Sequence, residues 1–197
     1  MQQKCLTQTT AVNCDYGFTL IELLITLVVL AVVLSLATPS FNVMIANNSS
    51  TSLASELTSA VNFARSEAVK RVKRVTVCPS SNGTSCLTSS DWAKGWLVFV
   101  DKAGTDSAAL EVETVLKYWD KLNSKTVVSL KRGALPPIGT NVSYLRFNAQ
   151  GMLARAGASD TEPRFFDMYI NGCKGESARR ILIGLAGMIS TSKTQCP

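Results

Sequence analysis

One apolar stretch near the start of the chain constrains the fold more than any other feature. Residues 18–37 read FTLIELLITLVVLAVVLSLA, in which 16 of 20 side chains are apolar and Glu22 is the only ionisable group. Twenty helical residues span about 30 Å, the thickness of the hydrocarbon core of a bilayer. We therefore predict a transmembrane helix over residues 18–39, followed by a domain of ordinary composition for a water-soluble protein.

Glu22 is an unusual residue for such a helix. A carboxylate at the centre of a bilayer costs about 2.5 to 3.5 kcal/mol, and less near a helix end, so it usually has a cationic partner. A cut after Gly17 would give Phe18 a free amine close to this depth. In a packed filament, the amine of one subunit could pair with Glu22 of its neighbour. The alternative is a tolerated Glu22 that reaches toward the membrane interface.

The segment before the apolar stretch fits an ordinary secretion signal poorly. A cleaved signal has a basic start, an apolar core of about 7 to 15 residues and small residues after it. Residues 1–17 carry one basic side chain, Lys4, and one acidic side chain, Asp15. Pro39 would also lie just past the cut. We therefore expect no cleavage after the helix.

The residues around Gly17 resemble the processing site of type IV pilins and of the pseudopilins of type II secretion. The matching stretch is Gly17-Phe18-Thr19-Leu20-Ile21-Glu22-Leu23-Leu24, which opens an uninterrupted apolar helix. The resemblance implies that a prepilin peptidase removes the leader, residues 1–17, and methylates the new N-terminus at Phe18. It also implies that residues 18–39 form a filament-core helix and that Glu22 acts in assembly.

After Pro39 the apolar residues keep a helical spacing. They recur every three or four positions and form one stripe at about 100° per residue. The stripe consists of Leu53, Leu57, Ala60, Val61, Ala64, Ala68, Val72 and Val75. We predict that the helix continues as an amphipathic segment over residues 40–75.

Short runs with strand character replace the helical pattern in the rest of the chain. Turn sequences such as Asn82-Gly83 and Pro136-Pro137 separate them. The runs are residues 75–78, 95–100, 110–119, 126–130, 142–147, 164–170 and 179–184. One long helix followed by about seven strands predicts an α+β fold of pilin type, in which the helix packs on one or more antiparallel sheets. Residues 76–197 would form the soluble β-rich region.

Cysteine use fits this topology. Cys5 and Cys14 would be lost with the leader, so four of the six cysteines would remain. These four are Cys78, Cys86, Cys173 and Cys196. Three pairings are possible, and nearness in sequence favours the first with the second and the third with the fourth. A zinc site is the competing interpretation, but the chain has no histidine and no CxxC pair. Disulfides place the domain in an oxidising compartment such as the bacterial periplasm and staple the C-terminal region.

The absence of histidine excludes every mechanism that needs an imidazole as a general base or metal ligand. Trp92, Trp96 and Trp119 could form a ligand platform, but aromatic residues at this spacing in strands are more typical of core packing. We expect no catalytic residues, no enzyme activity and no cofactor.

Four carboxylates could in principle bind calcium. They are Asp101, Asp106, Glu111 and Glu113. The loop over residues 102–109 lacks the regular spacing of oxygen ligands in known calcium sites, so a solvated hairpin fits better. We therefore expect no metal site.

Further segments narrow the resemblance to the GspH/FimT group of minor pilins and pseudopilins. They are Ala64-Arg65-Ser66-Glu67-Ala68, residues 75–80, residues 91–101, and Leu145-Arg146-Phe147-Asn148 followed by Gly151. Membership implies a minor subunit that helps to initiate or cap a type IV pilus or a type II secretion pseudopilus, with other minor and major subunits as partners. It also implies a single-pass inner-membrane protein whose domain lies in the periplasm before assembly.

Some members of this group bind DNA through a Gly-Arg-x-Arg motif close to the C-terminus. The corresponding stretch here is Gly187-Met188-Ile189-Ser190, which lacks both arginines. The net charge of +6 still allows weak phosphate contacts. The candidates are Lys174, Arg179, Arg180 and Lys193, and a solvated basic face is the alternative. A DNA-binding minor pilin, acting in DNA uptake, is therefore our second hypothesis.

Overall fold

The computed structural model describes residues 17–133, 139–155, 157 and 159–197. Apart from Gly17, the predicted leader, with Cys5 and Cys14, lies outside these residues. The chain divides into two compact units, Met1–Phe41 and Asn42–Pro197. Among the described residues, no helix is both long enough and apolar enough to cross a membrane. The transmembrane helix over residues 18–39 therefore stays a prediction.

One long helix precedes all the strands, as the sequence predicts. The elements are α1 (Leu20–Arg71), β1 (Arg74–Pro79), the 3₁₀ turn η1 (Trp92–Lys94), β2 (Trp96–Asp101), β3 (Val112–Trp119), β4 (Thr126–Arg132), β5 (Thr140–Asn141), β6 (Leu145–Phe147), β7 (Arg164–Ile170), β8 (Ala178–Ile183) and β9 (Ile189–Thr194). Every strand pairing is antiparallel. The predicted α+β class is confirmed.

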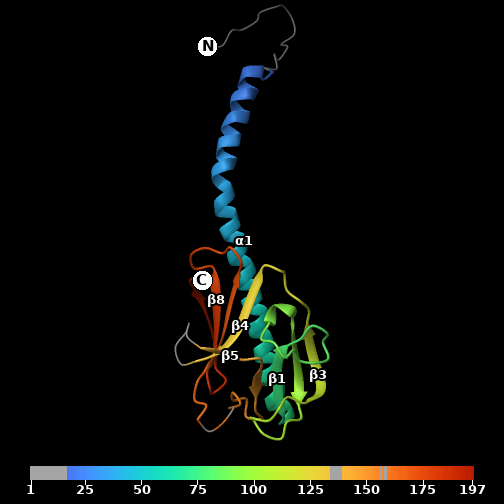
Figure 1. The fold of residues 1–197 in the computed structure, drawn as a ribbon. Coiled ribbons are helices and arrows are strands. Elements are labelled where there is room, and N and C mark those ends of the chain that lie inside the picture. The colour runs from blue at the N-terminus through green and yellow to red at the C-terminus, as the bar shows by residue number, and fades with distance from the viewer. Residues whose placement is uncertain (1–16, 134–138, 156, 158) are drawn as a thin grey trace, which may run out of the picture. The chain divides into compact units, whose positions relative to one another are not determined.

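The strands form two antiparallel sheets. One has the order β3-β2-β1-β6 and the other the order β5-β4-β7-β8-β9. Figure 1 shows them beside the second half of α1, and one apolar core joins the helix to both sheets. Leu57 of α1, Val77 of β1 and Ile181 of β8 are all fully buried in it. The residues between β3 and β4 lead from the first sheet to the second, where β4 lies between β5 and β7.

The helix ends at Arg71, so the predicted end at residue 75 is wrong. Val72 has a left-handed φ of 52°. Its N–H donates to the oxygen of Val69, and the N–H of Lys73 donates to the oxygen of Ala68. This pair of bonds is a Schellman motif, which satisfies the last carbonyl groups and turns the chain out of the helix. The stripe is buried up to Ala68, whereas Val72 is 73% exposed.

Two strands were not predicted. β5 has only two residues, too few to give a pattern. β9 reads ISTSKT and is half-exposed or exposed along its whole length. It is an edge strand that pairs only with β8 in the described sheet, so no apolar alternation marks it.

The aromatic residues support the packing interpretation. Trp92 and Trp96 are fully buried. Trp92 meets Phe166 edge to face at 4.8 Å between ring centroids, and Trp96 stacks on Trp119 at 6.0 Å. The first contact joins η1 to β7 of the second sheet, and the second lies between β2 and β3 within the first sheet.

Candidate functional site

The start of α1 carries the residues on which the processing prediction rests. The N–H of Glu22 donates to Thr19 Oγ1 at 3.2 Å, and the N–H of Leu23 donates to the oxygen of Thr19. Thr19 is therefore the N-cap of the helix, and Glu22 is its third residue, where a negative charge favours the positive end of the helix dipole. A cut after Gly17 would leave this cap intact.

Nothing in the fold requires glycine at position 17. A Cβ added to Gly17 would meet no atom within 4 Å, and its backbone does not adopt a left-handed φ. A larger side chain would therefore fit without strain. The described part of the fold therefore sets no requirement for a small residue at this position.

The first turns of α1 expose an unbroken set of apolar side chains. Every large apolar residue from Phe18 to Leu34 is between 48% and 82% exposed. Soluble monomers rarely leave so much contiguous apolar surface in water. This segment therefore needs an apolar environment, either lipid or other protein chains.

Both disulfides join the cysteines that are nearest in the sequence. Cys78 and Cys86 close a loop after β1, with 5.6 Å between their Cα atoms. Cys173 and Cys196 join the turn after β7 to the C-terminus, with 6.1 Å between their Cα atoms. The second bond holds the last residues of the chain next to the second sheet.

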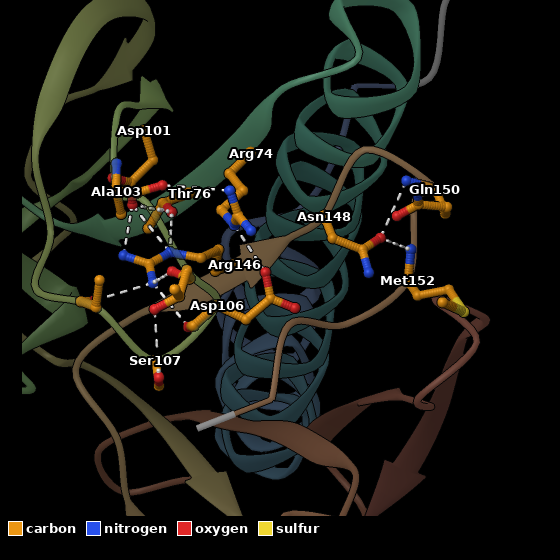
Figure 2. Close-up of polar contacts among 12 residues, drawn as sticks. Arg74, Thr76, Asp101, Ala103, Asp106, Ser107, Arg146, Asn148, Gln150 and Met152 are labelled. Atoms are coloured by element: carbon orange, nitrogen blue, oxygen red, sulfur yellow. Dashed lines mark hydrogen bonds and ion pairs between the residues drawn. The ribbon is translucent and has the colours of Figure 1, made fainter. Parts of the chain in front are cut away.

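A fully buried ion pair joins two of the segments that carry the family resemblance. Arg146 of β6 donates through Nε and Nη2 to Asp101 Oδ2 at 2.9 and 2.7 Å, and both side chains are 0% exposed. Thr76 of β1 donates to the same carboxylate oxygen at 2.8 Å. Figure 2 shows this cluster, in which Arg146 Nη1 also donates to the backbone oxygen of Asp106 at 2.7 Å. The pair fastens the start of the loop between β2 and β3 to β6, the last strand in the order of the first sheet.

Each of the four carboxylates that we considered for calcium has a basic partner. Asp101 is held by Arg146 as above. The other pairs are Asp106 with Arg74 at 2.7 Å, Glu113 with Lys73 at 2.6 Å and Glu111 with Lys102 at 3.6 Å. Across the described residues, no group of acidic or cysteine side chains could hold a metal ion. The carboxylates act as anchors of this hairpin.

The basic residues proposed to bind phosphate do not form one surface. Arg179 is 5% exposed, and its Nη2 donates to Asn47 Oδ1 and to Thr51 Oγ1 of α1. Its neighbour Arg180 faces the opposite side of β8, where Nε donates to Asp167 at 2.6 Å. Both guanidinium groups are therefore engaged within the chain.

Only Lys174 and Lys193 of the four candidates are exposed without an ion pair in the described part of the chain. Lys174 lies in the turn before β8, and Lys193 lies on β9 opposite Arg179. Two isolated lysines supply little phosphate affinity, because that affinity grows with the number of phosphates neutralised.

The stretch Gly187 to Ser190 forms the turn from β8 to β9 and the start of β9. Gly187 has a φ of 76°, and a Cβ there would overlap the carbonyl oxygen of Gly151. Glycine is therefore required at this position by the packing of two turns. Met188 is 74% exposed where the DNA-binding members carry an arginine.

Arg65 is a structural residue that the sequence did not single out by itself. Its Nε donates to the oxygen of Gly151 at 3.0 Å, and its Nη2 donates to the oxygen of Ala186 at 3.2 Å. It thus ties α1 to both turns. The one signal in the sequence for this structural role was the position of Arg65 next to Ala64, a residue of the buried stripe.

The pKa values of Glu67 and Tyr118 are shifted. The hydrogen bond from Arg71 lowers the pKa of Glu67, with the charges of Arg71 and Lys70 adding to the effect. Burial raises the pKa of Tyr118, and the nearby charge of Asp120 acts in the same direction. Both groups lie in structural contacts, and neither faces a second unpaired acid or base suited to proton transfer.

Comparison with known structures finds two crystal structures of the type IV minor pilin FimU from Pseudomonas aeruginosa. The first has 25% identity and a TM-score of 0.54, covering 74% of this chain and 89% of FimU. The second has 25% identity and a TM-score of 0.52, covering 72% of this chain and 91% of FimU. The minor pseudopilin EpsH of the Vibrio cholerae type 2 secretion system is a weaker match, at 11% identity and a TM-score of 0.47, over 73% of this chain and 96% of EpsH. No curated protein sequence matches the chain.

Two sequence families match adjoining parts of the chain. The prokaryotic N-terminal methylation motif matches residues 13–38. The family described as type II transport protein GspH matches residues 53–187, which is more than half of the chain. The fold, the disulfide-stapled domain and the likeness to FimU agree with this match, and the chain belongs to the GspH family of minor pilins and pseudopilins.

Proposed function

We propose that this protein is a minor subunit that helps to initiate or cap a type IV pilus or a type II secretion pseudopilus. The observation that carries the proposal is the helix start, where Glu22 is the only ionisable residue among exposed apolar side chains and lies within the methylation motif, residues 13–38. A structural role of this kind needs no cofactor and no catalytic residue.

Processing would occur between Gly17 and Phe18. The new amine would lie one residue before the N-cap Thr19, close to the positive end of the helix dipole, where a second positive charge is unfavourable. A carboxylate from a neighbouring subunit would relieve this repulsion. Glu22 is the only acidic residue between positions 18 and 37 that could supply it.

Residues 18–39 also account for how the protein would reach the filament. Residues 18–39 would hold the protein in the inner membrane, with the domain in the oxidising periplasm where both disulfides can form. The prepilin peptidase would act there first. Other minor and major subunits would then replace lipid around the apolar side chains.

Glu22 also has a possible local role, which an experiment must separate from pairing between subunits. Thr19 and Glu22 have the spacing of a capping box, and glutamine at the third helical position serves a capping box as well as glutamate does. Glu22→Gln therefore keeps the capping chemistry and removes the charge. Thr19→Ala is the matched control, since it weakens the cap by about 1 kcal/mol and keeps the carboxylate.

We expect Glu22→Gln and Glu22→Val to be processed normally but to enter filaments at least tenfold less than the wild type. Thr19→Ala should enter filaments nearly as well as the wild type. Immunoblots of sheared filaments and of membranes, in a strain with no other copy of the gene, measure both steps. Filament entry of Glu22→Gln at the wild-type level would refute the pairing role.

DNA binding is a weaker proposal. It would have to rely on Lys174 and Lys193, because Arg179 and Arg180 are bound to Asn47, Thr51 and Asp167.

A further inference from the structure

A compact apolar surface lies at the C-terminal end of α1. It is formed by Val69, Val72, Met152 and Met188, and we call it the helix-end surface. These side chains are 50%, 73%, 45% and 74% exposed, respectively. Methionine is common at protein-binding surfaces because its flexible side chain adapts to different partners. The processing and pairing steps proposed above make no use of this surface.

Three segments that touch one another build the helix-end surface. A Cβ on Gly151 would lie 2.8 Å from Val69 Cγ2, and a Cβ on Gly187 would overlap the oxygen of Gly151. The last turn of α1, the turn before Met152 and the turn before Met188 are therefore in direct contact, which places the exposed apolar residues of all three segments near one another.

Hydrogen bonds hold the backbone beneath the helix-end surface in place. Arg65 ties α1 to both turns through the two carbonyl oxygens described above. Asn148 Oδ1 accepts from the N–H of Gln150 at 3.1 Å and from the N–H of Met152 at 3.0 Å, as Figure 2 shows. A surface fixed before binding loses little conformational entropy on association.

Val72 gives a second, independent indication. A β-branched residue with a positive φ is a genuine outlier, and glycine would occupy this position of a Schellman motif without strain. The side chain of Val72 is mostly exposed, so it gains little from packing within the described part of the chain. Strain that the fold itself does not need points to a function outside the chain.

The border of the helix-end surface is basic. In the part of the chain that the structure describes, Arg65 is bound only to carbonyl oxygens, and Lys70 and Arg71 share one carboxylate, that of Glu67. These three cations and one anion leave an excess of positive charge around the apolar centre. In a face-to-face contact between two copies of this chain, both copies would bring this positive border, so they would repel each other there.

We propose that the helix-end surface docks another subunit of the same filament, through an apolar patch of that subunit bordered by carboxylates. The proposal rests on the proposed function, since it names the kind of partner that a minor subunit contacts. The apolar centre supplies the contact area, and the basic border selects an acidic partner.

Photo-crosslinking in cells of the native host tests the proposal with the full-length protein. p-Benzoylphenylalanine is introduced at position 72 or 188, and at position 115 as a control, because Val115 is a 41% exposed valine on β3, outside the surface. Illumination of assembled filaments should crosslink positions 72 and 188 to a different pilin-type subunit, identified by mass spectrometry. The yield should be at least tenfold above that at position 115.

A second variant separates docking from folding. Val72→Gly removes both the strain and the side chain, so it should raise the melting temperature by about 2 to 4 °C while lowering the crosslinking yield from position 188 at least threefold. If Val72 had only a structural role, Val72→Gly would not raise the melting temperature and at the same time lower the crosslinking yield from position 188.

Three outcomes would count against the proposal. Normal entry into filaments without crosslinks from positions 72 and 188 would overturn docking and leave the proposed function standing. Crosslinks only between two copies of this chain would overturn the choice of partner. Absence of the wild-type protein from filaments would overturn the proposed function, and docking with it.

Discussion

Replacement of Arg146 by methionine should destabilise the domain far more than its position in a three-residue strand suggests. Methionine has a similar length and no charge, so it leaves Asp101 buried without its cation. Removing one partner of a buried ion pair costs about 3 to 5 kcal/mol. Asp101 keeps the hydroxyl of Thr76 and the N–H groups of Ala103 and Glu111 as donors. We therefore expect the lower end of this range, about 3 kcal/mol.

Thermal denaturation followed by circular dichroism, on the full-length chain in detergent, measures this effect. For a domain of this size, about 3 kcal/mol lowers the melting temperature by roughly 6 to 12 °C. Lys73→Met is the matched control, because its partner Glu113 is 34% exposed and an exposed pair contributes less than about 1 kcal/mol. The control should shift the melting temperature by no more than about 4 °C.

A double variant checks that the unpaired charge is the cause. Asp101→Asn combined with Arg146→Met removes both charges and keeps an oxygen that can accept from Ala103 and Glu111. It should be more stable than Arg146→Met alone. Equal losses from Arg146→Met and from the Lys73→Met control, or a double variant less stable than either single change, would refute this account of the buried pair.

Three further predictions follow from the remaining sites. Gly17→Ala should be processed nearly as well as the wild type and Gly17→Leu should keep its leader on immunoblots, whereas removal of the leader from Gly17→Leu would contradict a peptidase requirement. The full-length chain in detergent should not retard duplex DNA at moderate salt, and tight retardation that Lys174→Ala with Lys193→Ala weakens would reverse that conclusion. Because Arg71 lowers the pKa of Glu67 in the folded state, the stability from this contact should be complete above the ordinary value of 4.5 and lost as the pH falls through the lower folded value. Glu67→Gln should flatten that part of the stability profile in acid, and an unchanged profile would argue against the contact.

The helix and most strands could be predicted because local patterns determine them. The stripe from Leu53 to Ala68 has the period of a helix, and the core strands have apolar runs between turn residues. The end of the helix could not be predicted, because Val72 continues the apolar spacing and carries no signal for a left-handed turn. β9 was not predicted because it has no apolar pattern: an edge strand with polar residues lacks the alternation that burial imposes.

Contacts between distant segments explain what the sequence could not predict about the candidate sites. Arg179 and Arg180 look equivalent in the sequence, but neighbouring residues of a strand face opposite sides. Only the fold shows that one is bound to α1 and the other to Asp167. Asp101 and Arg146 lie 45 positions apart and become partners because β1 pairs with both β2 and β6.

The family resemblance and the individual role of this subunit therefore rest on different residues. Asp101, Arg146 and Gly187 match or border the family segments, and all three act within the fold. A partner can distinguish this subunit only by what the fold leaves exposed, since buried residues make no contact outside the chain. The apolar start of α1 lies in a motif that this chain shares with other proteins, so it cannot by itself specify a neighbour. The helix-end surface, with an exposed Met188 at the position where DNA-binding members carry an arginine, is where specificity for one neighbour can reside.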